Sequence, residues 1–348
     1  MTRFLAPLAL LLPLSGTALA ASEFDPSADP AALASAFVKT DRLAMLASMK
    51  RAAIAQFRVE FAVENDAKAS SSGTTGWSSS QSDIKLVGVT DEARQLIADQ
   101  LHDKLVQDLA ATGLEVVPHA VVRETEGYKS LGPVMRSGQE PLGTRTGKSV
   151  FVGARAMPYY LTNDDRHLGL GTTLGAFSTT QPQNIEPTIA KALNAAVFRV
   201  TVFVAFADQS TSGGLFNIGS SVKTSARLAI VPALTQFLIV MPDGRARVYL
   251  NDTILLGGDA LVMKETTTTG EKATQAVANL VTGLLAGGGR SLAHYEASTT
   301  PDAYAAVVTR YGLALEAAMM SAMRPALGVT PAPAAPTDPP KAASAPPS

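Results

Sequence analysis

The chain of 348 residues contains no cysteine. This absence excludes a framework of disulfide bonds and an N-terminal cysteine that carries a lipid. The formal net charge is only −1, so composition gives no basic surface for nucleic acid or for an anionic membrane. The hydrophobic fraction of 46% is ordinary for a globular protein.

Long apolar runs are equally scarce, and the one that stands out lies at the start. Arg3 precedes an apolar run over residues 4–14, and Ala18 and Ala20 form a small-x-small cleavage site. The run is shorter than the roughly 20 residues of a membrane-spanning helix. We therefore expect residues 1–20 to be a signal peptide and Ala21 to begin a mature chain that is periplasmic or associated with the outer membrane, without being a lipoprotein.

The stretch over residues 196–250 carries the strongest β pattern and is expected to organise the rest of the chain. Large apolar residues alternate through AVFRVTVFVAF, which is typical of strands. Pro242, Asp243 and Gly244 are typical of a turn. We predict a long antiparallel meander that supplies the main sheet, with Pro232 marking an edge or a bulge.

Elements that surround a sheet are expected on both sides of this stretch. FRVEFAVEN, from Phe57, predicts a strand with one solvated face. Residues 90–112 predict a helix capped by Thr90 and ended by Gly113. Its apolar stripe is Ala93, Leu96, Ile97, Leu101, Leu105 and Leu109. Strand, helix and the short strand LEVVP then form a β-α-β layer, which indicates an α/β fold.

The remaining segments complete a domain plan. We expect an N-terminal helical segment over residues 21–55, with its helix at 29–50, and a single α/β domain over residues 56–328. Within the domain, helices are predicted from VVRETEGYKSL, NIEPTIAKALN, EKATQAVANLVTGLLA and the segment that Thr300 caps. A proline- and alanine-rich tail, residues 329–348, has the composition of a disordered chain.

Trp77 is the only tryptophan, and it lies in the serine- and glycine-rich stretch of residues 67–83. This composition predicts a mobile loop. Tryptophan is enriched where proteins bind each other, so Trp77 is a candidate partner contact. The alternative, that Trp77 folds back onto the body of the protein, is equally compatible with the sequence.

Two glycine-rich stretches imitate nucleotide-binding motifs. In GTRTGKS, Gly143 and Gly147 enclose three residues where a phosphate-binding loop needs four, and the segment leads into an apparent strand. In GLGTTLG, Gly169, Gly171 and Gly175 lack the spacing and the preceding strand of a dinucleotide fingerprint. We expect no nucleotide and no other cofactor.

Candidate catalytic and metal-binding residues are scattered. The four histidines are His102, His119, His167 and His294. No metal-binding histidine pair or serine-nucleophile motif occurs. Asp164 and Asp165, followed by His167, have the residue types of metal ligands, although consecutive loop carboxylates are more typical of a solvated turn. Asp208 and Asp243 are predicted at strand ends. A periplasmic hydrolase stays an alternative that no motif supports.

The order of these elements resembles the CsgG-like family of curli secretion channels. The resemblance rests on FRVEFAVEN, the helix DEARQLIADQLHDKLVQDLAATG, the strand LEVVP, and the helix and strand KALNAAVFRVTVFVAF with the later PDGR turn. It covers about residues 56–250. It implies an α/β fold similar to anticodon-binding domains, and an envelope protein of assembly or export that is not an enzyme.

Family members that form pores do so as rings to which each subunit contributes hairpins, and the link QSTSGGLFNIGSSVK stands where such a hairpin would be. The family's lipid-bearing cysteine is absent here. The family normally builds its channel constriction from aromatic and amide residues between the first strand and the first helix. In this chain a serine-rich stretch stands there, with Trp77 as an aromatic residue and Asn65 as an amide. We therefore expect an accessory that binds envelope proteins, with a homo-oligomeric channel subunit as the alternative and with no nucleic acid, nucleotide or metal.

Overall fold

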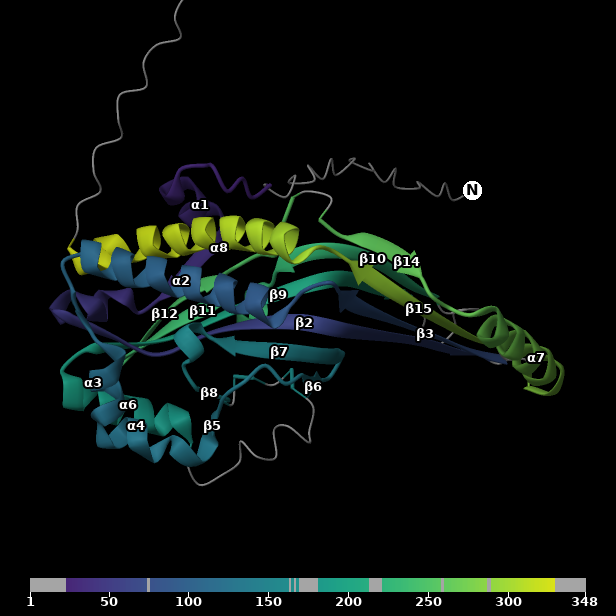
Figure 1. The fold of residues 1–348 in the computed structure, drawn as a ribbon, viewed down its shortest axis with the longest axis horizontal. Helices are drawn as coiled ribbons and strands as arrows, with labels where there is room; N and C mark the ends of the chain where they lie inside the picture. Colours follow the sequence, from purple (N-terminus) through teal and green to yellow (C-terminus); the bar gives the residue numbers. More distant parts are fainter. Residues whose placement is uncertain are drawn as a thin grey trace, which may run out of the picture.

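The computed structural model describes residues 23–73, 76–162, 164–165, 167–168, 181–212, 221–257, 260–286 and 289–328. The predicted signal peptide with its cleavage site, the glycines of GLGTTLG and the predicted disordered tail lie outside these residues. Within them the fold is mixed α/β, as predicted: a large, mostly antiparallel sheet of 13 strands with flanking helices (Figure 1).

The strands of the large sheet are β1 (Val38–Asp41), β2 (Arg51–Gly73), β3 (Gly76–Val87), β4 (Glu115–Val117), β6 (Leu142–Thr144), β7 (Gly147–Gly153), β9 (Ala196–Ser212), β10 (Ser221–Ile230), β11 (Gln236–Met241), β12 (Gly244–Leu250), β13 (Ile254–Leu255), β14 (Val262–Glu265) and β15 (Gly289–Ser298). Two more, β5 (Met135–Arg136) and β8 (Tyr159–Tyr160), pair separately.

The α-helices are α1 (Pro30–Phe37), α2 (Asp91–Ala111), α3 (His119–Glu124), α4 (Glu126–Ser130), α6 (Pro182–Leu193), α7 (Thr269–Ala286) and α8 (Pro301–Met323). Short 3₁₀ turns are η1 (Leu43–Ser48), η2 (Gly132–Val134), η3 (Ala154–Ala156), η5 (Pro232–Leu234) and η6 (Arg324–Leu327).

The strand at the centre of the sheet is β2, not the predicted meander. This strand is 23 residues long. It pairs in parallel with β9 and β4 and antiparallel with β7 and β3. The FRVEFAVEN pattern is only the middle of this strand. A single strand therefore ties the two halves of the chain together.

The antiparallel meander itself is confirmed. β9 pairs with both β10 and β11, and β11 pairs with β12. Pro242 and Asp243 form the turn between β11 and β12, because Met241 pairs with Gly244. Pro232 falls in the η5 turn between β10 and β11, where its missing N–H costs no ladder hydrogen bond.

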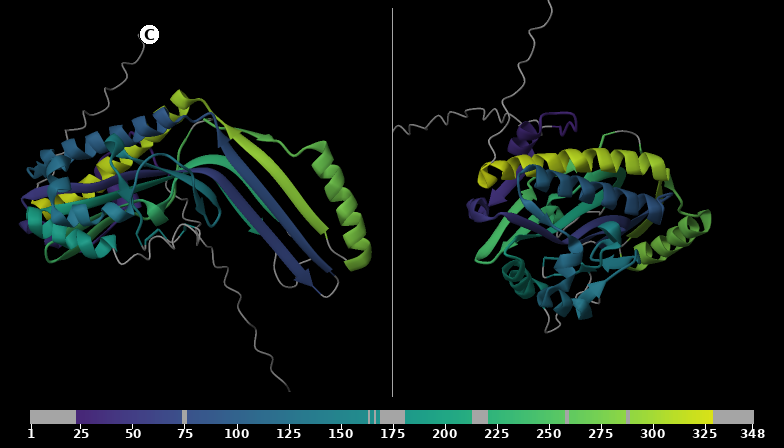
Figure 2. Two further views of the ribbon diagram at one scale, coloured as in Figure 1. Left: turned by 60° about the horizontal axis from the view of Figure 1, so that its bottom comes forward. Right: turned by 60° about the vertical axis from the view of Figure 1, so that its left-hand side comes forward.

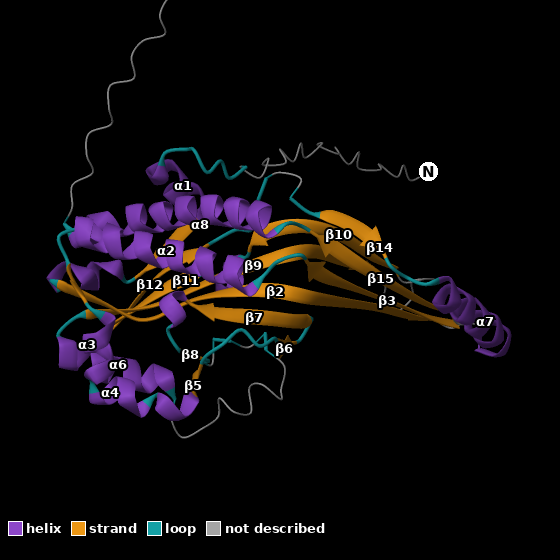
Figure 3. Ribbon diagram, viewed as in Figure 1, coloured by secondary structure: helices purple, strands orange, loops and turns teal. Residues whose placement is uncertain are grey.

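Helices cover both faces of the sheet in the body of the molecule. α2 and α8 lie side by side on one face, and α3, α4 and α6 lie on the other (Figures 1 and 3). The larger core forms between the sheet and the α1, α2 and α8 side, and includes Phe57, Phe198 and Tyr304. A smaller core around Tyr160 and Ile189 lies under α3, α4 and α6.

The two longest helices follow their sequence signals closely. The Thr90 side chain accepts from the Ala93 N–H at the start of α2, and Gly113 has a φ of +86° beyond its end. Thr300 caps α8, as predicted, and the helix buries Tyr304, Val308, Tyr311, Leu315 and Met319. One member of the predicted α2 stripe is wrong: Leu96 is 50% exposed, while Leu101 is buried against α8.

Two helix predictions need correction. The expected N-terminal helix ends at Phe37, after eight residues, and the chain continues as β1 and η1. The expected helix over VVRETEGYKSL is divided at Thr125, whose hydroxyl accepts from the Tyr128 N–H and begins α4. At Thr125 a local cap divides the helix, whereas after Phe37 the chain becomes extended and pairs with β12.

The largest correction concerns residues 67–83, which were expected to form a mobile loop. They belong to the hairpin of β2 and β3, paired from Glu64 with Lys85 to Gly73 with Gly76. Small side chains make this pairing dense. Ala67 faces Ser82 across the hairpin and Ala69 faces Ser80, and all four are buried. A serine-rich segment thus forms a strand because its backbone pairs with β2 on one side and with β15 on the other.

This hairpin is part of an arm that projects from the body (Figures 1 and 2). We define the arm as residues 64–73, 76–87, 205–212, 221–226, 260–286 and 289–298, which include the far ends of β2, β3, β9 and β10 together with β14, α7 and β15. β15 pairs in parallel with β3, and β14 pairs with β15. Some Cα atoms of β10 lie within 8 Å of β3 and β14, so the sheet of the arm curls.

Candidate functional site

A group of buried charged residues lies on the α3, α4 and α6 side of the sheet. On β2, Phe57 and Phe61 point toward α2 and α8, so Arg58 and Glu60 point to the opposite face. That face was expected to be solvated. Instead Arg58 is 4% exposed and Glu60 is 3% exposed. Arg199 on β9, also 4% exposed, joins them from the neighbouring strand.

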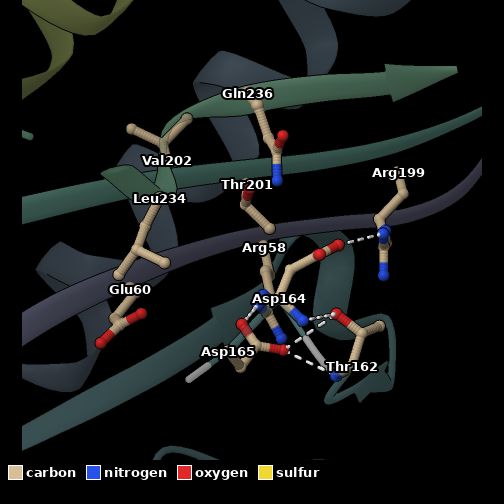
Figure 4. A pocket seen from close by; sticks show the side chains of 10 residues that line it. All are labelled: Arg58, Glu60, Thr162, Asp164, Asp165, Arg199, Thr201, Val202, Leu234 and Gln236. Carbon is tan, nitrogen blue, oxygen red and sulfur yellow. Dashed lines mark hydrogen bonds and ion pairs between the residues drawn. The ribbon is translucent and has the colours of Figure 1, made fainter. Parts of the chain in front are cut away.

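The segment after β7, by which we mean residues 154–162, 164–165 and 167–168, covers these side chains. Arg58 forms an ion pair with Asp165 and donates to the Tyr160 carbonyl at 2.9 Å. Arg199 contacts Asp164 at 2.8 Å. The segment also provides a close pair between His167 Nε2 and Glu60 Oε1, 2.9 Å apart. Figure 4 shows the aspartates approaching the sheet from this segment.

A second contact reaches Arg199 from α6. The Nε atom of Arg199 lies 3.3 Å from Oε1 of Glu186, which is on α6. Glu186 also accepts a hydrogen bond of 2.9 Å from the Tyr160 hydroxyl. The backbone N–H of Tyr160 donates at 2.8 Å to the Gln56 side chain. The ionic cluster therefore joins β2, β9, α6 and the segment after β7, and we define it as Arg58, Glu60, Asp164, Asp165, His167, Glu186 and Arg199.

Electrostatics within the ionic cluster favours the charged forms. Burial alone would raise the pKa of Asp165, but the Arg58 guanidinium and the Thr162 N–H hold that pKa below its usual value. Burial would likewise lower the pKa of Arg199, and Glu186 holds it above its usual value. Burial and the adjacent Glu186 carboxylate raise the pKa of Tyr160, so this hydroxyl stays protonated.

The space among these side chains is very small. The cavity lined by Arg58, Asp165, Arg199 and their neighbours has a volume of about 10 Å³. That is about the minimum for one water molecule. Several buried atoms have no hydrogen-bond partner among the described residues: Gln56 Nε2, Arg58 Nε, His167 Nδ1, Glu186 Oε2 and Arg199 Nη1. A water at this place would supply partners for such groups.

The structure brings the Asp164, Asp165 and His167 candidates into this cluster. Each of the two aspartates faces a guanidinium, and His167 faces Glu60. In the part of the chain that the structure describes, no three His, Asp or Glu side chains are grouped as a metal site would require. The arrangement serves to attach the covering segment to the sheet.

The other histidines lie in different elements, outside the ionic cluster. His102 packs edge-on against Phe57 in the core under α2. His119 Nδ1 lies 3.1 Å from the Ile54 carbonyl, and burial lowers the pKa of this imidazole. His294, on β15 in the arm, lies 2.5 Å from Asp83 and 3.6 Å from Glu271 of α7.

The structure places the remaining predicted residues separately. Trp77 is the second residue of β3 and pairs with Ser72 near the end of the hairpin; its side chain lies outside the described residues. Asn65 pairs with Ile84 on β3 and Gly147 on β7. Asp243 is in the exposed β11–β12 turn, and the Asp208 side chain is outside the described residues.

The phosphate-loop imitation has a structural explanation. Gly147 and Lys148 begin β7, as expected from a segment that leads into a strand. Lys148 Nζ lies 2.9 Å from Glu64 Oε2 on β2. Its side chain is therefore committed to an ion pair between neighbouring strands.

Sequence reasoning did not single out Arg58 or Arg199, although a signal existed. Arg199 is the one charged residue in AVFRVTVF, and Arg58 stands between Phe57 and Val59 in QFRVEF, where Glu60 is the other charged residue. Charged residues are rarely fully buried unless they are paired. Among the described residues, no helix has the length and apolarity to span a membrane. Comparison with family models, curated proteins and solved structures finds no match for this chain.

Proposed function

We propose that this chain is a non-enzymatic protein of the bacterial cell envelope, a CsgG-like accessory in assembly, secretion or transport that acts by contacting other proteins. The observation that carries the proposal is the arm. β2 extends beyond the body to Gly73. Among the described residues, the part of β2 after Asn65 pairs only with β3. A projecting sheet of this kind offers surface to a partner.

The chemistry of the ionic cluster supports a non-enzymatic role. Its cavity of about 10 Å³ leaves no room for an organic substrate. Ligand pockets are commonly several hundred Å³. The carboxylates of Asp164 and Asp165 are held by guanidiniums, and a carboxylate held in this way is a poor general acid or base at neutral pH. We assign the ionic cluster a structural role.

Crosslinking from the arm tests the accessory role. A photoreactive residue in place of Lys68 or Ser70, both exposed on β2, should crosslink to an envelope protein that mass spectrometry identifies. The same residue in place of Glu115, exposed on the body, is the matched control. Equal crosslinking from both sites, or none from the arm in cells that express the protein, would count against a partner-binding arm.

One observation favours a second candidate, a subunit of an oligomeric channel. Two long hairpins, β2–β3 and β9–β10, lie in the same arm, and pore-forming members of the family contribute hairpins from each subunit. The link expected to form such a hairpin is partly strand, because β9 runs to Ser212 and β10 begins at Ser221. Light scattering on the purified mature protein separates the candidates. A detergent-dependent ring favours a channel, and a monomer or dimer favours an accessory.

A further inference from the structure

The sheet face that holds the ionic cluster continues beyond it, past α6, which packs against β11, and onto β12 and β1. The strand registers place residues in two rows across this face. The first row is Arg58, Thr201, Gln236, Tyr249 and Lys39. The second row is Gln56, Arg199, Leu238, Arg247 and Asp41.

The segment after β7 occupies only the β2 and β9 end of these rows. There Asp165 meets Arg58 and Asp164 meets Arg199. At the other end, on β11, β12 and β1, Lys39 and Arg247 are exposed and Gln236 and Tyr249 are half-buried. We call this end, formed by Lys39, Gln236, Arg247 and Tyr249, the open face.

Charge distinguishes the open face from an ordinary solvated surface. Lys39 and Arg247 have no carboxylate partner among the described residues. The one acidic side chain in the rows at this end, Asp41, lies 3.9 Å from the Arg42 guanidinium. The Arg247 guanidinium lies over the Tyr249 ring, 4.7 Å from its centroid, in a cation–π contact. Two unpaired cations beside an aromatic ring suit a carboxylate-bearing ligand.

We propose that the open face binds an acidic, extended peptide segment of a partner protein. The chain displays the same recognition on itself, since the consecutive Asp164 and Asp165 already occupy two arginines of the same rows. The inference rests on the proposed function, because it names the kind of partner that a protein-binding envelope accessory would take.

The strand spacing sets the pattern that such a segment needs. Lys39 pairs with Tyr249, two residues from Arg247 on β12. Diagonal neighbours of this kind lie about 7–8 Å apart. An extended chain advances about 3.3 Å per residue. Carboxylates two or three residues apart would therefore match Lys39 and Arg247.

A direct binding experiment tests this with the purified full-length chain. The probe is a fluorescent heptapeptide with glutamate at its first, fourth and last positions and serine elsewhere, and the control peptide has glutamine in place of glutamate. We expect the acidic peptide alone to bind, with an affinity that falls at higher salt. Arg247→Ala and Lys39→Ala should each weaken binding about three- to tenfold.

Matched variants make the result specific. Lys85→Ala removes an exposed cation from the arm and should leave binding unchanged. Asp41→Asn should strengthen binding, because Asp41 pairs in register with Arg247 across β1 and β12 and the change removes its negative charge from beside the open face. The proposal is overturned if Arg247→Ala binds like the wild type, if the glutamine peptide binds equally well, or if a single-stranded oligonucleotide binds in preference to the acidic peptide. None of these outcomes affects crosslinking from Lys68. If the open face does not bind the acidic peptide, the proposed accessory role can therefore still hold.

Discussion

Gly147 on β7 and Glu64 on β2 lie so close that a side chain at position 147 has no room. A Cβ atom on Gly147 would lie 2.0 Å from the Glu64 carbonyl oxygen, and the glycine has a φ of +136°. This contact falls where the pairing of β2 with β7 shifts register. The glycine that gave GTRTGKS its likeness to a phosphate-binding loop is thus required by strand packing.

Gly147→Ala should destabilise the fold strongly. The backbone conformation alone costs about 1–3 kcal/mol for a residue with a Cβ atom, and the clash with backbone atoms of Glu64 adds to it. Gly143→Ala is the control, because a Cβ atom there meets nothing within 4 Å. Urea denaturation of the two variants checks this. Equal stabilities would mean that β7 can shift along β2 at little cost.

Leu101→Ala in α2 should lower the free energy of unfolding by about 2–5 kcal/mol. Leu101 is 1% exposed and faces Gly312, where α2 and α8 approach closely. Leu96→Ala in the same helix is the control. Leu96 is 50% exposed, so its removal should cost at most about 0.5 kcal/mol. If the two variants lost similar stability, the orientation of α2 described above would be wrong.

The contrast between these two leucines shows how far the sequence could predict the fold. Periodicity and capping placed both ends of α2 and the start of α8 to within a residue, because those signals are local. The helical period of 3.6 residues does not determine whether a residue at the edge of an apolar stripe is buried, and Leu96 lies at such an edge. Only the packing of α8 against α2 decides which leucines are covered.

The arm and the ionic cluster could not be predicted for a different reason. Ser80 and Ser82 have the composition of a loop, and they become strand residues through pairing with β2 and with β15. Arg58 and Asp165 are 107 residues apart. Their pairing depends on which loop the fold brings over β2, and a single sequence gives no such information.

Glu316 on α8 should make the protein less stable as pH rises. Burial, and after it the nearby Asp108 carboxylate, raise the pKa of Glu316 well above its usual value. Above the unfolded pKa of about 4.3, the unfolded chain releases this proton while the folded chain keeps it. Stability is therefore lost at up to about 1.4 kcal/mol per pH unit until the folded pKa is reached.

Glu316→Gln removes this term and keeps the shape of the side chain. The variant should be more stable than the wild type at pH 7 and should approach it at pH 4, as urea denaturation between those values would measure. A constant difference across the range would show that Glu316 is ionised in the folded protein. Asp108→Asn serves as a second test, since it removes a neighbouring charge and should reduce the pH dependence.

Trp77 gives the prediction that decides whether the end of the arm binds a partner. Its backbone lies near the end of the β2–β3 hairpin, far along the arm from the body cores. If Trp77 contacts a partner, Trp77→Ala should leave the circular dichroism spectrum unchanged. It should weaken capture of the partner identified by crosslinking from Lys68 by about 2 kcal/mol or more, which is the effect of truncating a residue at the centre of an interface.

The control for Trp77→Ala is a change of the same strand that leaves the aromatic ring in place. Lys85→Ala on β3 is exposed and should alter neither the spectrum nor the capture. If Trp77→Ala changes neither the capture nor the spectrum, Trp77 does not contact the partner, and the rest of the arm stays the proposed binding surface. A collapsed spectrum would instead mean that the ring packs within the arm, so the aromatic would be needed for the strands to pair at all.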